Sequence, residues 1–186
     1  MNYPKSQSGF TLIELMVTIS MIVIFVSMAA SYNRTADQQI SLYREQGRVV
    51  NALYEARSLA ITTYNRNPNS LDACGYGIHI ASSTSLMVFK DLPDPLNNNQ
   101  CKSYTQPTGG IYTGSEEDVD SVSLSGVTIN VVGGDVNSNP VDILFVPPDP
   151  VVFSNQPFPL VLSLHAPIIS TDLNITINQF GQVTVQ

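Results

Sequence analysis

The chain has 186 residues, a formal net charge of −7 at pH 7 and no tryptophan. Its charge is segregated, because residues 10–66 hold five arginines against four acids (net +1) whereas residues 67–186 hold two lysines against eleven acids (net −9). A body this acidic repels phosphates, which disfavours proteins that bind DNA or RNA directly. The length from residue 67 onward suffices for one small globular domain.

A long apolar segment with a single carboxylate inside it follows a polar leader, residues 1–9. The run extends for 21 residues from Phe10 to Ala30, and Glu14 is its one ionisable side chain. At about 1.5 Å rise per residue, a helix of this length measures about 32 Å, enough to cross the hydrocarbon core of a bilayer. An acid within such a helix costs roughly 1 to 3 kcal/mol, which marks Glu14 as a candidate functional residue.

The residues at the start of this segment form a specific motif. Gly9 is followed by Phe10-Thr11-Leu12-Ile13-Glu14-Leu15, and this string resembles the prepilin cleavage and methylation motif of type IV pilins and type II secretion pseudopilins. The resemblance implies that a prepilin peptidase cuts between Gly9 and Phe10 and methylates the new amino group of Phe10. Glu14 would then pair with the amine of a neighbouring subunit, because each charge is costly in lipid while alone.

Two other interpretations of the segment stay open. A plain single-pass membrane anchor explains the apolar run but not the motif that begins at Gly9. An ordinary secretory signal peptide is the stronger alternative, because Ser27-Met28-Ala29 has the small-residue spacing of a signal-peptidase site and Lys5 supplies a positive n-region. Against it, the apolar core is long and is interrupted by Glu14.

The helix is expected to continue beyond the membrane, with residues 10–31 as the transmembrane part and residues 32–66 as an amphipathic extension. Pro68 ends it, because proline cannot continue the hydrogen-bond ladder. Helical spacing predicts one face that packs on a sheet, and the charged side chains around it are expected to be solvated. The predicted face comprises Tyr43, Val50, Leu53, Arg57, Ile61 and Tyr64, widened by Val49, Ala56, Ala60 and Thr63, and the charged residues are Arg44, Glu45, Arg48 and Glu55.

After residue 69 the hydrophobic period changes to two, which predicts β-strands over the globular part, residues 67–186. We predict a first hairpin from Tyr76–Ile80 and Leu86–Phe89 and a terminal hairpin in which Gly181 supplies the turn. The segment 91–114 is expected to be a long exposed loop. Further predicted strands are Ser121–Val132, Val141–Val146, Val151–Phe153, Leu160–Leu164, Leu173–Asn178 and Val183–Val185. The fold class expected is therefore α+β, a long N-terminal helix packed on an antiparallel β-sheet domain.

Candidate sites in the body are few. Cys74 and Cys101, the two cysteines, are expected to form a disulfide if the body folds in an oxidising compartment. His79 and His165 lie in apolar strand patterns, where a structural histidine is favoured over a general base, so no catalytic residues are proposed. An acidic cluster is a weak calcium candidate that lacks a known loop spacing, and a solvated loop is favoured. Its members are Glu116, Glu117, Asp118 and Asp120.

The order of elements supports a finer resemblance. A long helix, a hairpin that opens with Gly75-Tyr76-Gly77, and a last hairpin of the form Ile-Thr-Ile-x-x-x-Gly-x-Val are similar to the minor pseudopilins of the H class and related minor pilins. This implies a non-enzymatic subunit without cofactors, anchored once in the bacterial inner membrane, with its body in the periplasm or on an extracellular filament. Implied partners are other pilins or pseudopilins, the prepilin peptidase, the inner-membrane assembly platform and secreted cargo. The alternatives are a minor type IV pilin for adhesion, motility or DNA uptake, and a secreted soluble β-domain.

Overall fold

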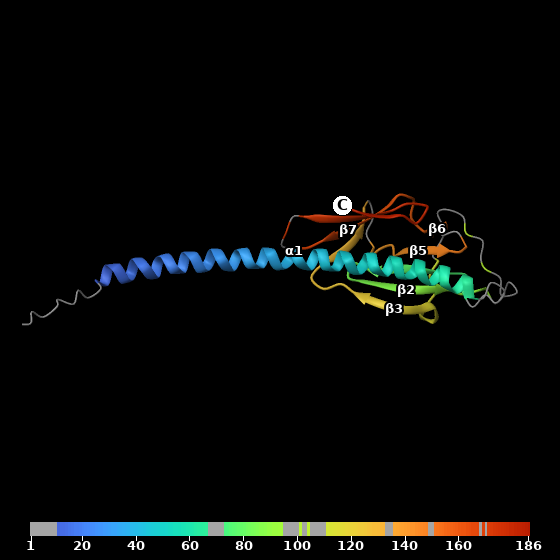
Figure 1. The fold of residues 1–186 in the computed structure, drawn as a ribbon, viewed down its shortest axis with the longest axis horizontal. Coiled ribbons are helices and arrows are strands. Elements are labelled where there is room, and N and C mark those ends of the chain that lie inside the picture. The colour runs from blue at the N-terminus through green and yellow to red at the C-terminus, as the bar shows by residue number, and fades with distance from the viewer. Residues whose placement is uncertain are drawn as a thin grey trace, which may run out of the picture. The chain divides into compact units, whose positions relative to one another are not determined.

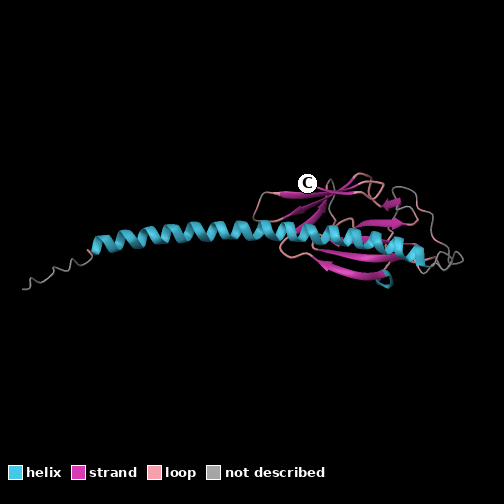
Figure 2. Cartoon of the chain, in the orientation of Figure 1, coloured by secondary structure: helices cyan, strands magenta, loops and turns pink. Residues whose placement is uncertain are grey.

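The computed structural model describes residues 11–66, 73–94, 101, 104, 111–132, 136–148, 151–167, 169 and 171–186, with only the helical backbone at residues 33, 34, 65 and 66. The chain divides into two compact units, Met1–Asp37 and Gln38–Gln186. One helix, α1 (Leu12–Arg66), runs through both units, and all strands lie in the second (Figure 2). The α+β arrangement expected from the sequence is confirmed. The domain boundaries expected at residues 31 and 66 stay predictions.

Two antiparallel sheets build the second unit together with α1. The five-stranded sheet has the order β3-β2-β1-β5-β6 and the four-stranded sheet the order β4-β7-β8-β9. In the view of Figure 1, β2 and β3 lie on one side of α1, whereas β7 and the red C-terminal strands lie on the other. The strands are β1 (Gly75–Ser82), β2 (Ser85–Asp91), β3 (Asp118–Ser123), β4 (Thr128–Val131), β5 (Val141–Val146), β6 (Val151–Ser154), β7 (Leu160–His165), β8 (Asp172–Ile177) and β9 (Val183–Val185), and a 3-10 turn, η1 (Ser115–Glu117), precedes β3.

One hydrophobic core joins α1 to both sheets. Along α1 the buried residues recur at spacings of three and four, so they form one stripe on the helix. Three of them are alanines. The stripe comprises Leu42, Val49, Ala52, Leu53, Ala56 and Ala60, and it packs in one cluster with Ile78, Val88, Ile143, Phe145, Leu162 and Ile175 of the sheets.

The predicted helix face is correct only in part. Leu53, Val49, Ala56 and Ala60 are buried as expected, but Tyr43 and Tyr64 are exposed. The face that packs is turned from the predicted one, because it is centred on Ala52, Ala56 and Ala60 and leaves both tyrosines outside. The helical spacing of apolar residues alone did not show which part of the wider predicted face would be buried.

The expectation that the helix charges are solvated is wrong for Glu45. Its side chain is fully buried in α1, and it is paired with Arg44 at 3.2 Å and with Arg48 at 2.8 Å. Arg48 also donates from Nη1 to the backbone carbonyl of Ser123 at the end of β3, at 2.8 Å. A buried carboxylate is tolerated when it is paired and hydrogen-bonded, so these charges tie α1 to the edge of the five-stranded sheet.

The strand predictions hold with one correction. The hairpin of β1 and β2, and β5 to β9, lie where they were expected within a residue or two. The single strand predicted over Ser121–Val132 is instead two strands, β3 and β4, in different sheets. Between them Gly126 adopts a positive φ of 71°, which glycine permits at little cost. The chain uses this bend to cross from one sheet to the other.

The expected long exposed loop also needs correction. Of residues 91–114, Asp91 and Ile111 are buried. Ile111 packs with Phe89 and Leu144 in a second small cluster on the outer face of the five-stranded sheet, where Tyr104 and Tyr112 join them. The described parts of this segment therefore cover the sheet. Residues 95–100, 102–103 and 105–110 lie outside the described residues.

The outer cluster requires glycine in β1. A Cβ atom added at Gly77 would lie 2.3 Å from the Ile143 carbonyl oxygen and 2.7 Å from the Phe89 ring. Such distances are far inside van der Waals contact, so the sheet would have to separate. The Gly-Tyr-Gly opening of the hairpin thus has a packing reason.

We predict that Gly77→Ala lowers the free energy of unfolding by about 3 kcal/mol, because overpacking cannot relax against a backbone carbonyl. The matched control is Gly47→Ala on α1, where an added Cβ meets nothing within 4 Å, and it should raise stability by about 0.5 to 1 kcal/mol. Urea unfolding of the full chain in detergent, followed by circular dichroism, measures both. Equal effects of the two substitutions would contradict the packing at Gly77.

Candidate functional site

The first half of α1 is apolar around its whole circumference. Its large side chains from Leu12 to Met28 are all exposed in the monomer. Within the described part of the chain, one helix is long and apolar enough to cross a membrane, and it is this one. A helix that is hydrophobic all round is buried in lipid or against other helices, so this segment is built for a non-aqueous environment.

The hydroxyl side chains within this segment are already hydrogen-bonded. Each donates to a backbone carbonyl one turn earlier, which satisfies it without water, as an apolar environment requires. The pairs are Thr18 with Leu15 at 2.9 Å, Ser20 with Met16 at 2.8 Å, Ser27 with Ile24 at 2.8 Å and Ser31 with Ser27 at 3.1 Å. The only remaining polar side chain between Leu12 and Ser31 is Glu14.

Glu14 lies in the first turn of α1. Its backbone N–H donates to Oγ1 of Thr11 at 3.4 Å, so Thr11 caps the helix. A carboxylate in a first turn also interacts favourably with the helix dipole. Toward the described residues, however, the Glu14 carboxylate makes no hydrogen bond or ion pair. The segment therefore presents one charge that needs a partner. Gly9 and Phe10 lie outside the described residues.

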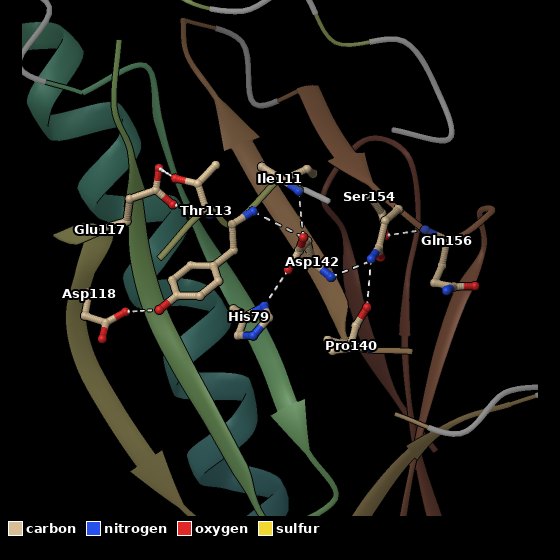
Figure 3. A network of polar contacts seen from close by, with 11 residues as sticks. His79, Ile111, Thr113, Glu117, Asp118, Pro140, Asp142, Ser154 and Gln156 are labelled. Carbon is tan, nitrogen blue, oxygen red and sulfur yellow. Dashed lines mark hydrogen bonds and ion pairs between the residues drawn. The ribbon is translucent and has the colours of Figure 1, made fainter. Parts of the chain in front are cut away.

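A second polar arrangement lies on the outer face of the five-stranded sheet and is centred on Asp142 of β5. Figure 3 shows His79 and Ile111 beside its carboxylate. Nδ1 of His79 lies 2.6 Å from Oδ1 of Asp142, and the backbone N–H groups of Ile111 and Tyr112 donate to Oδ2 at 2.7 and 3.2 Å. Three donors thus satisfy a buried carboxylate, as burial demands.

Tyr112 links this centre to the acidic cluster. Its ring stacks on His79 with centroids 4.2 Å apart, and its hydroxyl donates to Oδ1 of Asp118 at 2.8 Å. Burial, then the hydrogen bond to Asp118 and the surrounding carboxylates, raise the pKa of Tyr112 to about 12. Burial and a hydrogen bond to Asp91 likewise raise the pKa of Tyr104 far above its ordinary value. Both hydroxyls therefore stay protonated donors at physiological pH.

The acidic cluster is solvated as expected at Glu116, Asp118 and Asp120, but not at Glu117, and it lies in η1 and β3 rather than in a loop. Glu117 is buried and accepts hydrogen bonds from the backbone N–H and the hydroxyl of Thr113, both at 2.8 Å. Asp118 is exposed and accepts the hydrogen bond from Tyr112, so two of the four weak calcium candidates bind groups of the chain itself. Across the described residues, no three His, Cys, Asp or Glu side chains come together as metal ligands.

The disulfide expected from the two cysteines is present between Cys74 and Cys101. It closes a loop with a sequence separation of 27, which in the chain-entropy model stabilises the fold by about 3 to 4 kcal/mol. Cys74 directly precedes β1, so the bridge and the Asp142 contacts hold the covering segment at two places.

Each of the two histidines pairs with an aspartate, and a structural role for them stays a prediction. His79 and His165 each face an aspartate on the neighbouring strand, Asp142 and Asp172, in direct cross-strand register. The first pair is buried, with side-chain exposures of 12% and 4%, and the second is open, with 48% and 55%. Sequence reasoning missed Asp142. The one indication in the sequence that Asp142 is special was its position as an acid inside the apolar run Val141–Val146.

Comparison with known families bears on the N-terminal segment. Residues 4–30 match the family model described as the prokaryotic N-terminal methylation motif. Comparisons with curated proteins and with solved structures find no match. The chain therefore carries at its N-terminus the methylation motif that type IV pilins and pseudopilins share, and this motif overlaps the apolar first half of α1.

We predict that Asp142→Asn lowers the free energy of unfolding by about 2 kcal/mol, because it removes a charge that three buried groups contact. Asp172→Asn is the matched control, since it alters the same kind of His–Asp pair at an exposed position, and it should cost less than about 1 kcal/mol. Thermal unfolding of the full chain compares them, and limited chymotrypsin cleavage near Tyr112 should increase for Asp142→Asn alone. Equal losses would contradict a role for burial.

Proposed function

We propose that this chain, which carries the N-terminal motif of type IV pilins and pseudopilins, is a structural subunit of a pilus-like filament, most specifically a minor pseudopilin of a type II secretion system. The observation that carries the proposal is the state of Glu14. In a segment whose hydroxyls are all satisfied internally, it is the one side chain that still needs a partner. A single anchor gains nothing from such a charge, whereas an assembling subunit does.

The mechanism of assembly follows from charge and solvation. Cleavage between Gly9 and Phe10 creates an amine one helical turn before Glu14. Methylation of that amine leaves its positive charge in place. In a bundle of apolar helices the amine of one subunit pairs with Glu14 of its neighbour, which removes the cost of holding either charge alone in lipid. Assembly therefore stabilises exactly those subunits that have been processed.

The globular unit supports the finer assignment through its order of elements. The β1–β2 hairpin opens with Gly75 and Gly77, and the β8–β9 hairpin turns at Gly181, whose φ is 71°. Both features belong to the pattern that resembles the H class of minor pseudopilins. In this role the acidic body faces outward, toward other pseudopilins or cargo. The prepilin peptidase and the inner-membrane assembly platform are the further partners of the pathway.

A minor type IV pilin is the second candidate, because the matched motif is common to both machines. Within that candidate, adhesion or motility is favoured over DNA uptake by direct phosphate contact, since residues 67–186 carry a net charge of −9. A secreted soluble domain, cut near Ala29 or Ala30, is the third. It leaves Glu14 without a role.

The first prediction concerns processing. Chain recovered from membranes of a host with a prepilin peptidase should begin at Phe10 with a methylated amine, which intact mass and the N-terminal peptide establish together. Gly9→Ala should leave the leader attached if the peptidase needs glycine there, and Gly47→Ala is the control that should not alter processing. A chain that begins near Ala30 would establish the secreted domain and remove the assembly mechanism.

The second prediction concerns Glu14. Glu14→Ala should leave membrane insertion intact or improved, because it removes a charge from the apolar segment, but should lower incorporation into filaments by on the order of 10-fold or more. Glu55→Ala, at an exposed position of the same helix, is the control and should assemble normally. Both are measured by complementing a deletion strain. Loss of secreted proteins with intact surface pili assigns the secretion machine, and the reverse assigns the pilus.

A further inference from the structure

The outer side of β9 is an open edge of the four-stranded sheet. β9 is the last strand in the order β4-β7-β8-β9, so β8 is its one neighbour among the described strands. Of its three residues, Thr184 and Val185 are exposed and Val183 is partly buried. An edge strand presents backbone N–H and C=O groups that can pair with another chain.

The register of β8 and β9 identifies the backbone groups that face outward. Asn174 and Gln186 exchange both backbone hydrogen bonds, each at 2.9 Å. Bonded and non-bonded pairs alternate along an antiparallel ladder, so Val183 and Val185 each form a non-bonded pair with β8. The N–H and C=O groups of both valines therefore point away from β8, and no described residue bonds to them.

The edge of β3 in the other sheet is protected, in contrast to that of β9. The carboxylate of Asp120 accepts a hydrogen bond from the N–H of Ser121 at 2.8 Å. Nη1 of Arg48 donates to the carbonyl of Ser123 on the same strand, also at 2.8 Å. Charged side chains on an edge strand are a known means of preventing the addition of another strand. Residues 173–186, which include β9, contain no acidic or basic side chain, so this protection is absent there.

The core-facing row of side chains continues onto this open edge. Ile175 of β8 is fully buried, whereas Val185, its partner across the ladder, is 54% exposed. Val183 is partly buried and packs against the same core. A strand added beside β9 covers both valines, so apolar burial would add to the stabilisation by backbone hydrogen bonds.

A cation lies at the start of the edge. Arg57 of α1 is half-buried, and its Nη1 donates to the carbonyl of Gly181 at 3.4 Å, which is long for a charged hydrogen bond. Arg44 and Arg48 on the same helix both pair with Glu45. Among the described residues, no carboxylate forms an ion pair with Arg57. A cation that is partly removed from water favours an anionic partner, so charge complementarity requires a carboxylate at this end of β9.

We propose that the outer edge of β9 binds an extended segment of a partner protein, which adds to the four-stranded sheet as a further strand. The segment pairs its backbone with Val183 and Val185, places apolar side chains beside both valines, and carries a carboxylate that reaches Arg57. Strand addition to an exposed sheet edge is a recurrent mode of peptide recognition, in which main-chain hydrogen bonds give affinity and side chains give specificity. The inference concerns the globular unit alone and does not depend on processing at Gly9 or on which machine the subunit serves.

Hydrogen exchange of the full chain in detergent, resolved at single amides by NMR, tests the proposal. The probe is a short synthetic peptide of alternating threonine and valine that ends in glutamate. At saturating peptide, exchange of the Val183 and Val185 amides should slow by about 10-fold or more, because both amides become hydrogen-bonded. The control is the same peptide N-methylated at every amide, which should cause no slowing. Slowing by both peptides or by neither would overturn the proposal. So would slowing that rises with chain concentration in the absence of peptide, because a second copy would then be the occupant.

Two variants give the second arm. Arg57→Gln should weaken binding of the peptide by about 10-fold, because it removes the charged partner of the glutamate. Lys90→Gln, on β2 of the other sheet, removes the same charge elsewhere and should leave binding unchanged. Val185→Pro removes an N–H that points away from β8, which an edge strand tolerates, and it should abolish the slowing at Val183 while the thermal unfolding curve stays close to that of the unmodified chain. Equal binding by Arg57→Gln and Lys90→Gln would contradict the proposal even if Val185→Pro failed to fold. Normal Phe10 processing in every variant separates this result from the fate of the proposed function.

Discussion

The fold depends on one buried stripe of α1 that packs against both sheets. Leu42, Val49 and three alanines of this stripe share a single hydrophobic core with the five-stranded and the four-stranded sheet. The buried Glu45, held by Arg44 and Arg48, fixes the same helix to the edge at Ser123. The helix with the apolar N-terminal segment is thus the same helix whose later part packs in the core of the globular unit.

The N-terminal half of α1 and the globular unit have surfaces of opposite polarity. The first has a surface that water does not stabilise, and it satisfies its hydroxyls internally, leaving only Glu14 to a partner. The second has an acidic, water-exposed surface and satisfies its buried carboxylates internally, as Asp142 and Glu117 show. The two parts therefore suit an apolar and an aqueous environment, and Glu14 is the one charge in the apolar part.

Much of this could be predicted from local pattern. Strands such as β5 and β9 follow from alternation and turn residues, and the N-terminal motif is specific in itself. What could not be predicted depends on contacts between distant segments. The sequence predicts Glu45 at the surface, whereas in the fold it is buried beside Arg48, which also contacts Ser123. Asp142 accepts hydrogen bonds from the backbone of residues 111–112, some thirty positions earlier in the chain. The exposure of Tyr43 likewise depends on which part of the helix packs against the sheets, and helical spacing alone does not specify that part.

The cover on the five-stranded sheet has a consequence for how variation is distributed. Ile111 packs with Phe89 and Leu144, and Tyr112 joins them, so the outer face of that sheet is covered there and five of the six residues of β5 are buried. In the four-stranded sheet, β7 and β8 alternate between buried and more open positions. Lineages that inherit this chain should therefore diverge at every second residue of β7 and β8, while β5 accepts substitutions at almost none.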